Sequence, residues 1–308
     1  MSTDGGHACL RLGIDLGGTK IAAEVLDGDG RTRHSHRQTS PRGNYEATIE
    51  AIAAGVARAE AECGGSVSVG LGIPGSISPS LGVVQNANST WLNGKPLGRD
   101  IERRLGRQVR IANDANCFAL SEAADGAGSG AASVFGVILG TGCGGGLVSG
   151  GRLVDGPRGI GGEWGHNPLP WPGPGELPGP QCWCGKRGCM ETWVSGPGLA
   201  ADHEGRTGQR LTATEIAAAA SSGNEACRAS LDRHVSRLAR GLAAVVNILD
   251  PEVIVLGGGL SEMAHLYARL PELMAPWLFS LDRRADIRPP KHGAASGVRG
   301  AARLWEQR

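Results

Sequence analysis

The chain has 308 residues, enough to bury a large core as one large domain or two of ordinary size. Its 31 Lys and Arg residues nearly balance its 30 Asp and Glu residues, which gives no electrostatic reason to expect binding to nucleic acid or to an anionic membrane. No run of about 18 apolar residues is present, so the sequence predicts no membrane-spanning helix. Because the polar start, Met1 to Cys9, has no apolar signal region, we expect a cytoplasmic protein.

The N-terminal part of the chain predicts an alternation of strands and helices, which is typical of an α/β fold. Residues 10–26 have the pattern of two strands joined by a glycine turn. Apolar residues at helical spacing, among them Ile49, Ile52 and Val56, indicate a helix over residues 44–63. The later elements expected in this part are a strand over 67–73, a short helix over 97–105, a strand over 109–112 and a helix over 117–124.

The C-terminal part begins in a similar way, with a strand over residues 133–139, a glycine-rich turn and a further short strand. A capping box from Thr212 to Glu215 indicates the start of a short helix. The remaining elements expected are a long amphipathic helix over 225–249, a strand over 253–256 and a helical tail over 295–305. Since both parts begin with a strand, a glycine turn and a strand, we expect two related domains.

The turn Asp15-x-Gly17-Gly18-Thr19-Lys20 is the first candidate for phosphate binding. Glycines let backbone N–H groups approach a phosphate, Thr19 adds a hydroxyl donor, and Asp15 could hold a water molecule of a magnesium ion. An ordinary hairpin turn explains the pattern equally well. It is not a P-loop, because Thr19 and Lys20 come in the wrong order and a strand follows.

A second glycine turn, Gly140-Thr141-Gly142-x-Gly144-Gly145, follows the strand over residues 133–139. Its spacing matches the dinucleotide fingerprint, but a short strand follows it where the fingerprint needs a helix. We therefore expect a second phosphate-contacting hairpin that faces the first across a cleft. A third glycine turn, Gly257-Gly258-Gly259, could lie against the flat face of an adenosine, or it could be only a tight strand-to-helix turn.

Asn113 and Asp114 come at the end of a predicted strand and before a predicted helix. A carboxylate there points toward whatever binds at the strand ends, and it could accept the proton of a substrate hydroxyl. Either side chain could instead only cap the helix. From the residues alone, capping is the simpler interpretation.

A cluster of cysteines gives the most specific signal in the sequence, and a histidine precedes it. The four side chains are His166, Cys182, Cys184 and Cys189. Their number and type predict a zinc site, and four protein ligands leave no open position for water, so the zinc would be structural. Glu163 and Glu191 flank the cluster, and carboxylates beside a fixed imidazole N–H suit a polyhydroxyl ligand.

Together these motifs resemble the ROK family of sugar kinases and related repressors over almost the whole chain. The matching motifs are Asp15-x-Gly17-Gly18-Thr19-Lys20, Pro74-Gly75, Asn113-Asp114-Ala115-Asn116, Leu139-Gly140-Thr141-Gly142-x-Gly144, Gly162-Glu163-x-Gly165-His166, Cys182-x-Cys184-Gly-x-x-Gly-Cys189-x-Glu191 and Gly257-Gly258-Gly259. Each motif alone is modest, but all of them in this order are specific. Within the family, residues 88–94, 166–171 and 247–259 are most similar to bacterial fructokinases of the manno(fructo)kinase type.

The resemblance implies an α/β, actin-like ATPase fold, in which two RNase H-like domains bind ATP and a sugar in the cleft between them. It implies a small N-terminal domain formed by residues 1–115 and closed by a C-terminal helix in residues 295–308. Residues 116–294 would form the larger domain with the zinc site. The family often forms dimers, so the resemblance also implies a homodimer.

The resemblance further implies roles for single residues, and it makes Asp114 the catalytic base in place of a helix cap. The residues expected to hold the sugar are Gly75, Asn113, Asp114, Glu163, His166 and Glu191. Those expected to contact ATP are Asp15, Gly17, Gly18, Thr19, Lys20, Gly140, Thr141, Gly142, Gly144, Gly257, Gly258 and Gly259. The implied zinc ligands are His166, Cys182, Cys184 and Cys189.

We therefore expect an ATP- and Mg²⁺-dependent hexose kinase that converts fructose to fructose 6-phosphate. Mannose, glucose or N-acetylglucosamine is the alternative substrate. A sugar-responsive regulator without turnover is a second alternative, but the repressors of the family carry an N-terminal DNA-binding domain, and only about nine residues precede the first predicted strand here. The loop over residues 168–180, with six prolines in thirteen positions, is expected at the rim of the sugar pocket.

Overall fold

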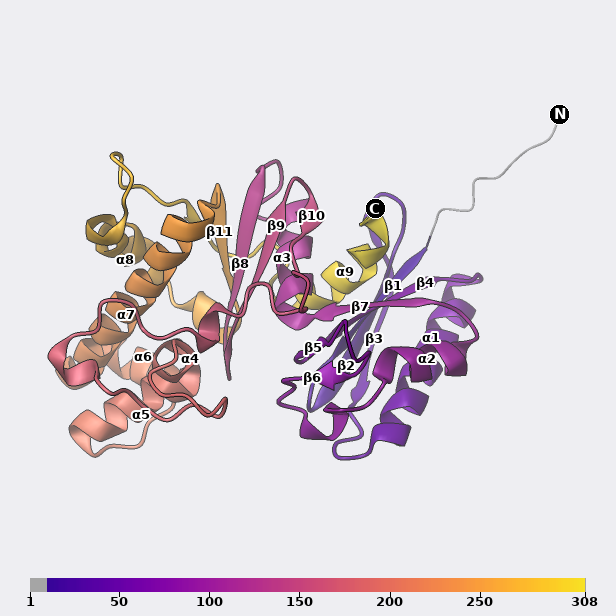
Figure 1. Cartoon of the computed structure of the whole chain (residues 1–308), viewed down its shortest axis with the longest axis horizontal. Coiled ribbons are helices and arrows are strands. Elements are labelled where there is room, and N and C mark those ends of the chain that lie inside the picture. The colour runs from indigo at the N-terminus through magenta and orange to yellow at the C-terminus, as the bar shows by residue number, and fades with distance from the viewer. Residues whose placement is uncertain (1–9, 308) are drawn as a thin grey trace.

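The structure of the chain, a computed structural model, describes residues 10–307. It has two lobes, each built on one sheet, with helices α3 (Asp114–Ala124) and α9 (Ser296–Arg303) between the two sheets (Figure 1). Within the described residues, no helix combines the length and the apolar composition needed to cross a bilayer. The expectation of a cytoplasmic protein rests on Met1 to Cys9, which lie outside the described residues, and it stays a prediction.

The first sheet has the strand order β3-β2-β1-β4-β7. Strand β1 runs antiparallel to β2 and parallel to β4, and β4 runs parallel to β7. The bounds are β1 Arg11–Leu16, β2 Lys20–Leu26, β3 Thr32–Thr39, β4 Ser68–Ile73 and β7 Val109–Asn113. Because β4 and β7 are parallel neighbours, their carboxyl ends lie at the same edge of the sheet, where Ile73 pairs with Asn113.

The second sheet repeats this arrangement with the order β10-β9-β8-β11-β12. Here β8 is antiparallel to β9 and parallel to β11, and β11 is parallel to β12. The bounds are β8 Ser133–Leu139, β9 Cys143–Ser149, β10 Arg152–Leu153, β11 Val253–Gly257 and β12 Ile287–Arg288. The repeated order confirms two related α/β units, whereas the exact domain boundaries stay a prediction.

Most of the predicted helices are present near their expected bounds. Helix α1 begins after Asn44, whose side chain accepts a hydrogen bond from the Ala47 N–H, and it ends at Gly64 with φ 66°. Besides α3 and α9, the α-helices are α1 Tyr45–Cys63, α2 Leu97–Leu105, α4 Glu191–Val194, α5 Gly196–Thr207, α6 Ala213–Ser221, α7 Glu225–Leu249 and α8 His265–Met274. The capping box at Thr212 is confirmed, with both of its hydrogen bonds formed at the start of α6.

Some elements differ from the sequence prediction. Helix α3 begins at Asp114, three residues earlier than the expected start at Cys117, because Asn113 acts as its N-cap. The glycines from Gly144 to Gly146 lie inside β9, where they pair with β8, and are not part of the preceding turn. The strands and α-helices missed from the sequence are β3, the small hairpin of β5 (Ser76–Ile77) and β6 (Val84–Gln85), β12, α4 and α5. The helix expected after Gly257-Gly258-Gly259 is present as the 3-10 helix Gly259–Glu262 followed by α8, which begins only at His265.

Helix α9 packs directly on the first sheet. A Cβ atom at Gly13 of β1 would lie 1.8 Å from the Val298 carbonyl oxygen, and one at Gly70 of β4 would lie 1.9 Å from the Ala301 carbonyl oxygen. On the helix itself, a Cβ at Gly300 would lie 1.7 Å from the carbonyl oxygen of Cys117 in α3. No side chain fits at these contacts, so the glycines hold α9 between the first sheet and α3.

Each lobe has its own apolar core. In the first, Ile52 and Val56 of α1 pack with residues of the first sheet. In the second, Val235, Leu238 and Leu242 of α7 pack with residues of β8 and β11. Each fully buried Leu, Ile or Val stabilises the fold by about 1.5–3 kcal/mol, so the two lobes provide separate and rigid walls for a site between them.

Candidate active site

A cavity of about 430 Å³ lies between the lobes. From the first lobe and the start of α3 it is lined by Pro74, Gly75, Asn86, Asn88, Asn113 and Asp114. From the second lobe it is lined by Ile138, Thr141, Gly142, Cys143, Gly144, Gly145, Glu163, His166, Trp183 and Glu191. All six residues expected to hold a sugar are therefore in the lining, together with three of those expected to contact ATP.

Asp114 and Asn113 are held at the junction of β7 and α3. The Asn113 side-chain amide donates to the Gly75 carbonyl (2.9 Å), and its oxygen accepts from the Ala115 N–H (2.9 Å). One Asp114 oxygen also accepts from the Ala115 N–H (2.8 Å). Asn113 is thus the cap, and Asp114 lines the cavity at the start of α3.

The electrostatic surroundings of Asp114 favour proton uptake near neutral pH. Burial, followed by repulsion from Asp15 and Glu163, raises the pKa of the Asp114 carboxyl to about 6. The Ala115 N–H and Asn113 oppose this shift only in part. A carboxylate with such a pKa is an effective general base at the pH of most cells.

The opposite wall carries Glu163, His166 and Glu191. The 3-10 helix Trp164–His166 positions the first two, and the Trp164 indole N–H donates to the Gly144 carbonyl (3.0 Å) to fix this turn on β9. Burial raises the pKa of Glu163, with His166 opposing and Glu191 reinforcing the shift. Glu191 opens α4, and one of its oxygens accepts from the Cys143 N–H (3.0 Å).

The predicted metal cluster is assembled in space. The ligand atoms of His166, Cys182, Cys184 and Cys189 all lie within 4.8 Å of one another. The Cys184 and Cys189 sulfurs are 3.6 Å apart, and the Cys182 sulfur is 3.6 Å from His166 Nδ1. Tetrahedral zinc with Zn–S bonds of about 2.3 Å requires sulfur separations of roughly 3.8 Å, so the donor set and its spacing fit zinc.

Several residues predicted to contact ATP lie outside this cavity. They are Asp15, Gly17, Gly18, Thr19, Lys20, Gly140, Gly257, Gly258 and Gly259. The second and third glycine turns are nevertheless neighbours, because a Cβ at Gly258 (φ 80°) would lie 2.3 Å from the Leu139 carbonyl oxygen. Burial raises the pKa of Asp15, with Lys20 opposing the shift. Asp15 pairs with Gly72 of β4, which in turn pairs with Ala112 of β7, so Asp15 and Asp114 lie at the same edge of the first sheet. The role of these residues in binding a nucleotide stays a prediction.

The expectation for the proline-rich loop is wrong, because no residue of 168–180 lines the cavity. The loop is instead attached to helix α7. Glu176 accepts hydrogen bonds from Arg237 (2.8 Å) and Arg240 (2.8 Å), and these arginines lower the pKa of Glu176, against the effect of burial, to about 2. The loop leads away from His166 because buried arginines on α7 supply its partners.

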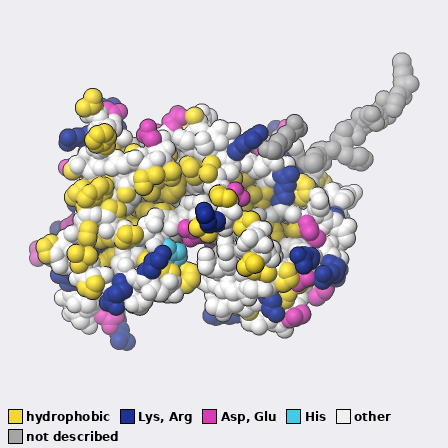
Figure 2. Space-filling model, viewed as in Figure 1, with side chains coloured by type: hydrophobic (Ala, Val, Ile, Leu, Met, Phe, Trp, Pro, Cys, Tyr) yellow, Lys and Arg dark blue, Asp and Glu magenta, His cyan; other side chains and the backbone are white. Residues whose placement is uncertain are grey.

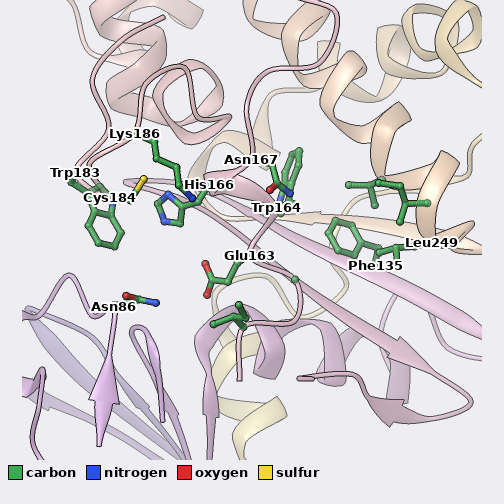
Figure 3. A pocket seen from close by; sticks show the side chains of 14 residues that line it. Asn86, Phe135, Glu163, Trp164, His166, Asn167, Trp183, Cys184, Lys186 and Leu249 are labelled. Carbon is green, nitrogen blue, oxygen red and sulfur yellow. The ribbon is translucent and has the colours of Figure 1, made fainter. Parts of the chain in front are cut away.

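Sequence reasoning assigned no role to Asn86, Asn88 and Trp183, although all three line the cavity. Asn86 has φ 57°, a conformation that asparagine tolerates better than most residues, but this angle cannot be read from the sequence. A second cavity of about 750 Å³ adjoins the first and shares Asn86, Glu163, His166 and Trp183 with it (Figure 3). Its further lining is mainly apolar and includes Phe135, Trp164 and Leu249.

Comparison with known proteins gives concordant matches. The model of the ROK family matches residues 11–308. An N-acetyl-D-glucosamine kinase from Shigella boydii is 40% identical over 299 residues, which cover 96% of this chain and 99% of that protein. The structure of a ROK hexokinase from Thermus thermophilus aligns with a TM-score of 0.84 at 35% identity, covering 95% of this chain and 96% of that one. A ROK family glucokinase from Streptomyces griseus, in complex with glucose and AMPPNP, aligns with a TM-score of 0.78 at 31% identity, covering 96% and 98%.

Proposed function

The chain belongs to the ROK family, and from this membership and the cavity between its lobes we propose that it is an ATP-dependent hexose kinase. Its fold is the actin-like fold of the ROK kinases of known structure. The observation that supports the proposal most directly is the position of Asp114. Its carboxyl, with a pKa raised to about 6, lines a polar cavity at the strand ends.

In the proposed reaction, Asp114 takes the proton of a hexose hydroxyl. The hydroxyl oxygen then forms a bond to the γ-phosphorus of ATP, and the bond from that phosphorus to the bridging oxygen of ADP breaks. Asn113, Glu163, His166 and Glu191 hold the other hydroxyls, so that the attacking oxygen is oriented toward the phosphate. The products are a hexose phosphate, ADP and a proton that Asp114 later releases to solvent.

The phosphates of ATP would be held by the glycine turns that carry Thr19 and Thr141. Both turns offer backbone N–H groups, and Thr141 lies in the cavity lining beside the sugar wall. The carboxylate of Asp15 is a hard oxygen donor close to Asp114, and it fits a magnesium ion or one of its waters. Magnesium, when bound, would balance the charge of the phosphates.

We infer that the preferred hexose is N-acetyl-D-glucosamine. Relatives named for that activity share 40% of residues with this chain over nearly their whole length. Fructose, which the motif resemblance favoured, is the second candidate, but none of the relatives and structures described above is named for fructose. The regulator alternative receives least support, since the proposed base is present at the cavity.

A structural zinc ion would be held by His166, Cys182, Cys184 and Cys189. With four protein ligands it would supply no water for chemistry, and its contribution would be to fix His166 and the turn that leads to Glu191.

A homodimer also stays a prediction. Hydrophobic side chains gather on the lobe that carries α7 and β8 (Figure 2), and exposed Ile248 and Phe279 in that lobe are suited to such a contact.

Steady-state kinetics with ATP and four hexoses test the substrate proposal. We expect N-acetyl-D-glucosamine to have the highest kcat/KM among itself, glucose, mannose and fructose, with one hexose phosphate formed per ADP released. A higher kcat/KM for fructose would restore the second candidate. Hexose binding without ADP release for all four sugars would contradict the kinase assignment.

A further inference from the structure

Trp183 occupies an unusual position for a large apolar residue. It lies between two of the predicted zinc ligands, Cys182 and Cys184, and its side chain is 60% exposed. It lines both the sugar cavity and the larger cavity beside it. Figure 3 shows its indole beside the His166 ring. Since so little of the ring is buried, core packing does not explain a tryptophan here.

The indole N–H of Trp183 donates to Oε1 of Glu191 at 2.7 Å. The other oxygen, Oε2, accepts from the Cys143 backbone N–H at 3.0 Å. Both oxygens of Glu191 are therefore fixed, one by Cys143 at the start of β9 and one by Trp183 in the cysteine turn, residues 182–189. A hydrogen bond of this length between a rigid indole and a carboxyl oxygen has a defined direction, so the Trp183 bond holds the orientation of Glu191.

The Trp183 ring also contacts the second group of this wall. Its centroid lies 4.9 Å from that of the His166 imidazole, with the planes at 88°, an edge-to-face arrangement. One side chain thus restrains both Glu191 and His166. Glu163, by comparison, has no hydrogen bond from Trp183 among the described residues.

We propose that Trp183 is a positioning residue that sets the affinity and selectivity of the cavity for its hexose, because it fixes Glu191 through its indole N–H and His166 through its ring. The proposal rests on the proposed function, in which Glu191 and His166 contact the hexose. It goes beyond that function in assigning selectivity to a side chain at the rim. The substrate class concerned is a hexose whose hydroxyls bind a carboxylate in a fixed orientation.

The test compares Trp183→Phe and Trp183→Ala with wild type. Phenylalanine keeps an aromatic ring beside His166 but removes the N–H, so we expect the KM for the hexose to rise about tenfold, equivalent to about 1.4 kcal/mol. Alanine removes both contacts, so its KM should rise further. Both variants should show a smaller difference in kcat/KM between hexoses, while the KM for ATP, the zinc content and the melting temperature stay at wild-type values.

Trp305→Phe is the matched control, because its indole N–H also donates a hydrogen bond, to the Val69 carbonyl (2.8 Å), and Trp305 does not line either cavity. It should leave the hexose KM unchanged. A second control places Trp183→Phe on a Glu191→Ala background, where no further rise is expected, since coupled residues are not additive.

An unchanged hexose KM in Trp183→Phe would overturn the proposal, as would a rise of the same size in the Glu191→Ala background. Equal rises in the KM for hexose and ATP would also contradict it, because they indicate a general structural effect. Failure of the kinase assignment is recognised separately, since the wild-type protein itself would then phosphorylate none of the hexoses.

Discussion

At the scale of single residues, two properties of Asp114 both raise the pKa of its carboxyl. It is buried at a helix start, which raises its pKa, and it lies near the carboxylates of Asp15 and Glu163, which raise it again. Among the described residues, no ion pair with Asp114 compensates for this destabilisation of its ionised form. A carboxylate that is destabilised in its charged form is a better proton acceptor at neutral pH.

The pH dependence of the reaction follows from this pKa. A general base must be ionised to act, so kcat/KM should be constant above pH 7 and fall about tenfold per pH unit below the Asp114 pKa of about 6. A pH–rate profile with saturating ATP from pH 4.5 to 8.5 measures it. A plateau that extends down to pH 4.5 would contradict the assignment of the raised pKa to the base.

Single residues also show which parts of the candidate site could be predicted from the sequence alone. Asn113 and Asp114 could be identified because a polar pair at a strand-to-helix junction has few roles. The sequence left open which of the two is the cap, and the structure assigns the capping bond to Asn113. Trp183 could not be identified, since its bond to Glu191 depends on a fold of the cysteine turn that spacing does not specify.

At the scale of elements, the cysteine turn and the short helix α4 form one unit. Cys189 is followed directly by Met190 and then by Glu191, the first residue of α4. The turn is closed by backbone hydrogen bonds, from Cys182 N–H to the Lys186 carbonyl and from Gly185 N–H to the Cys182 carbonyl. Disturbing the metal ligands should therefore move a residue of the sugar wall.

Replacement of one cysteine tests this connection. Cys184→Ala should lose the single zinc ion expected per chain, lower the melting temperature and raise the KM for the hexose, while the KM for ATP changes little. Cys63→Ala is the control, because Cys63 ends α1 and lies outside the cluster. Wild-type zinc content and hexose KM in Cys184→Ala would rule against a zinc ion that holds this wall.

The crossing of α3 and α9 is a second element with a specific requirement. Gly300→Ala would place a Cβ 1.7 Å from the Cys117 carbonyl oxygen, and we expect a loss of at least about 1–3 kcal/mol in the free energy of unfolding. Gly205→Ala in α5 is the matched control, because no atom lies within 4 Å of its Cβ. It should be neutral or stabilise by up to about 1 kcal/mol. Urea titrations compare the two, and equal effects would contradict the packing argument.

The elements missed from the sequence have local patterns that do not indicate a strand or a helix, and long-range contacts stabilise them. Strand β3 is an edge strand whose sequence, TRHSHRQT, is almost entirely polar, so it has no apolar alternation to detect. Helix α5 starts with Gly-Pro-Gly, a pattern that suggests a turn when it is read locally. Contacts with α7 stabilise α5, and such long-range packing cannot be obtained from propensity.

At the scale of the whole molecule, the two sheets have equivalent strand orders, and the cavity is lined by residues of both lobes. The sequence indicated two related halves through their repeated strand, glycine turn and strand. It did not give the order of the strands in each sheet, because the pairings of β1 with β4 and of β8 with β11 join segments far apart in the chain. The arrangement brings Asp114 from one half to Glu163 and His166 from the other.

The most direct test of the account is the Asp114→Asn variant, measured for hexose binding by calorimetry and for turnover by ADP release. Asparagine keeps the size of the side chain and an oxygen that can accept from the Ala115 N–H, but it cannot accept a proton from a hydroxyl. We expect kcat to fall by about 10²–10⁴ while the hexose Kd stays within about threefold of the wild-type value. Near-normal turnover in this variant would contradict the assignment of Asp114 as the base, and with it the proposed mechanism.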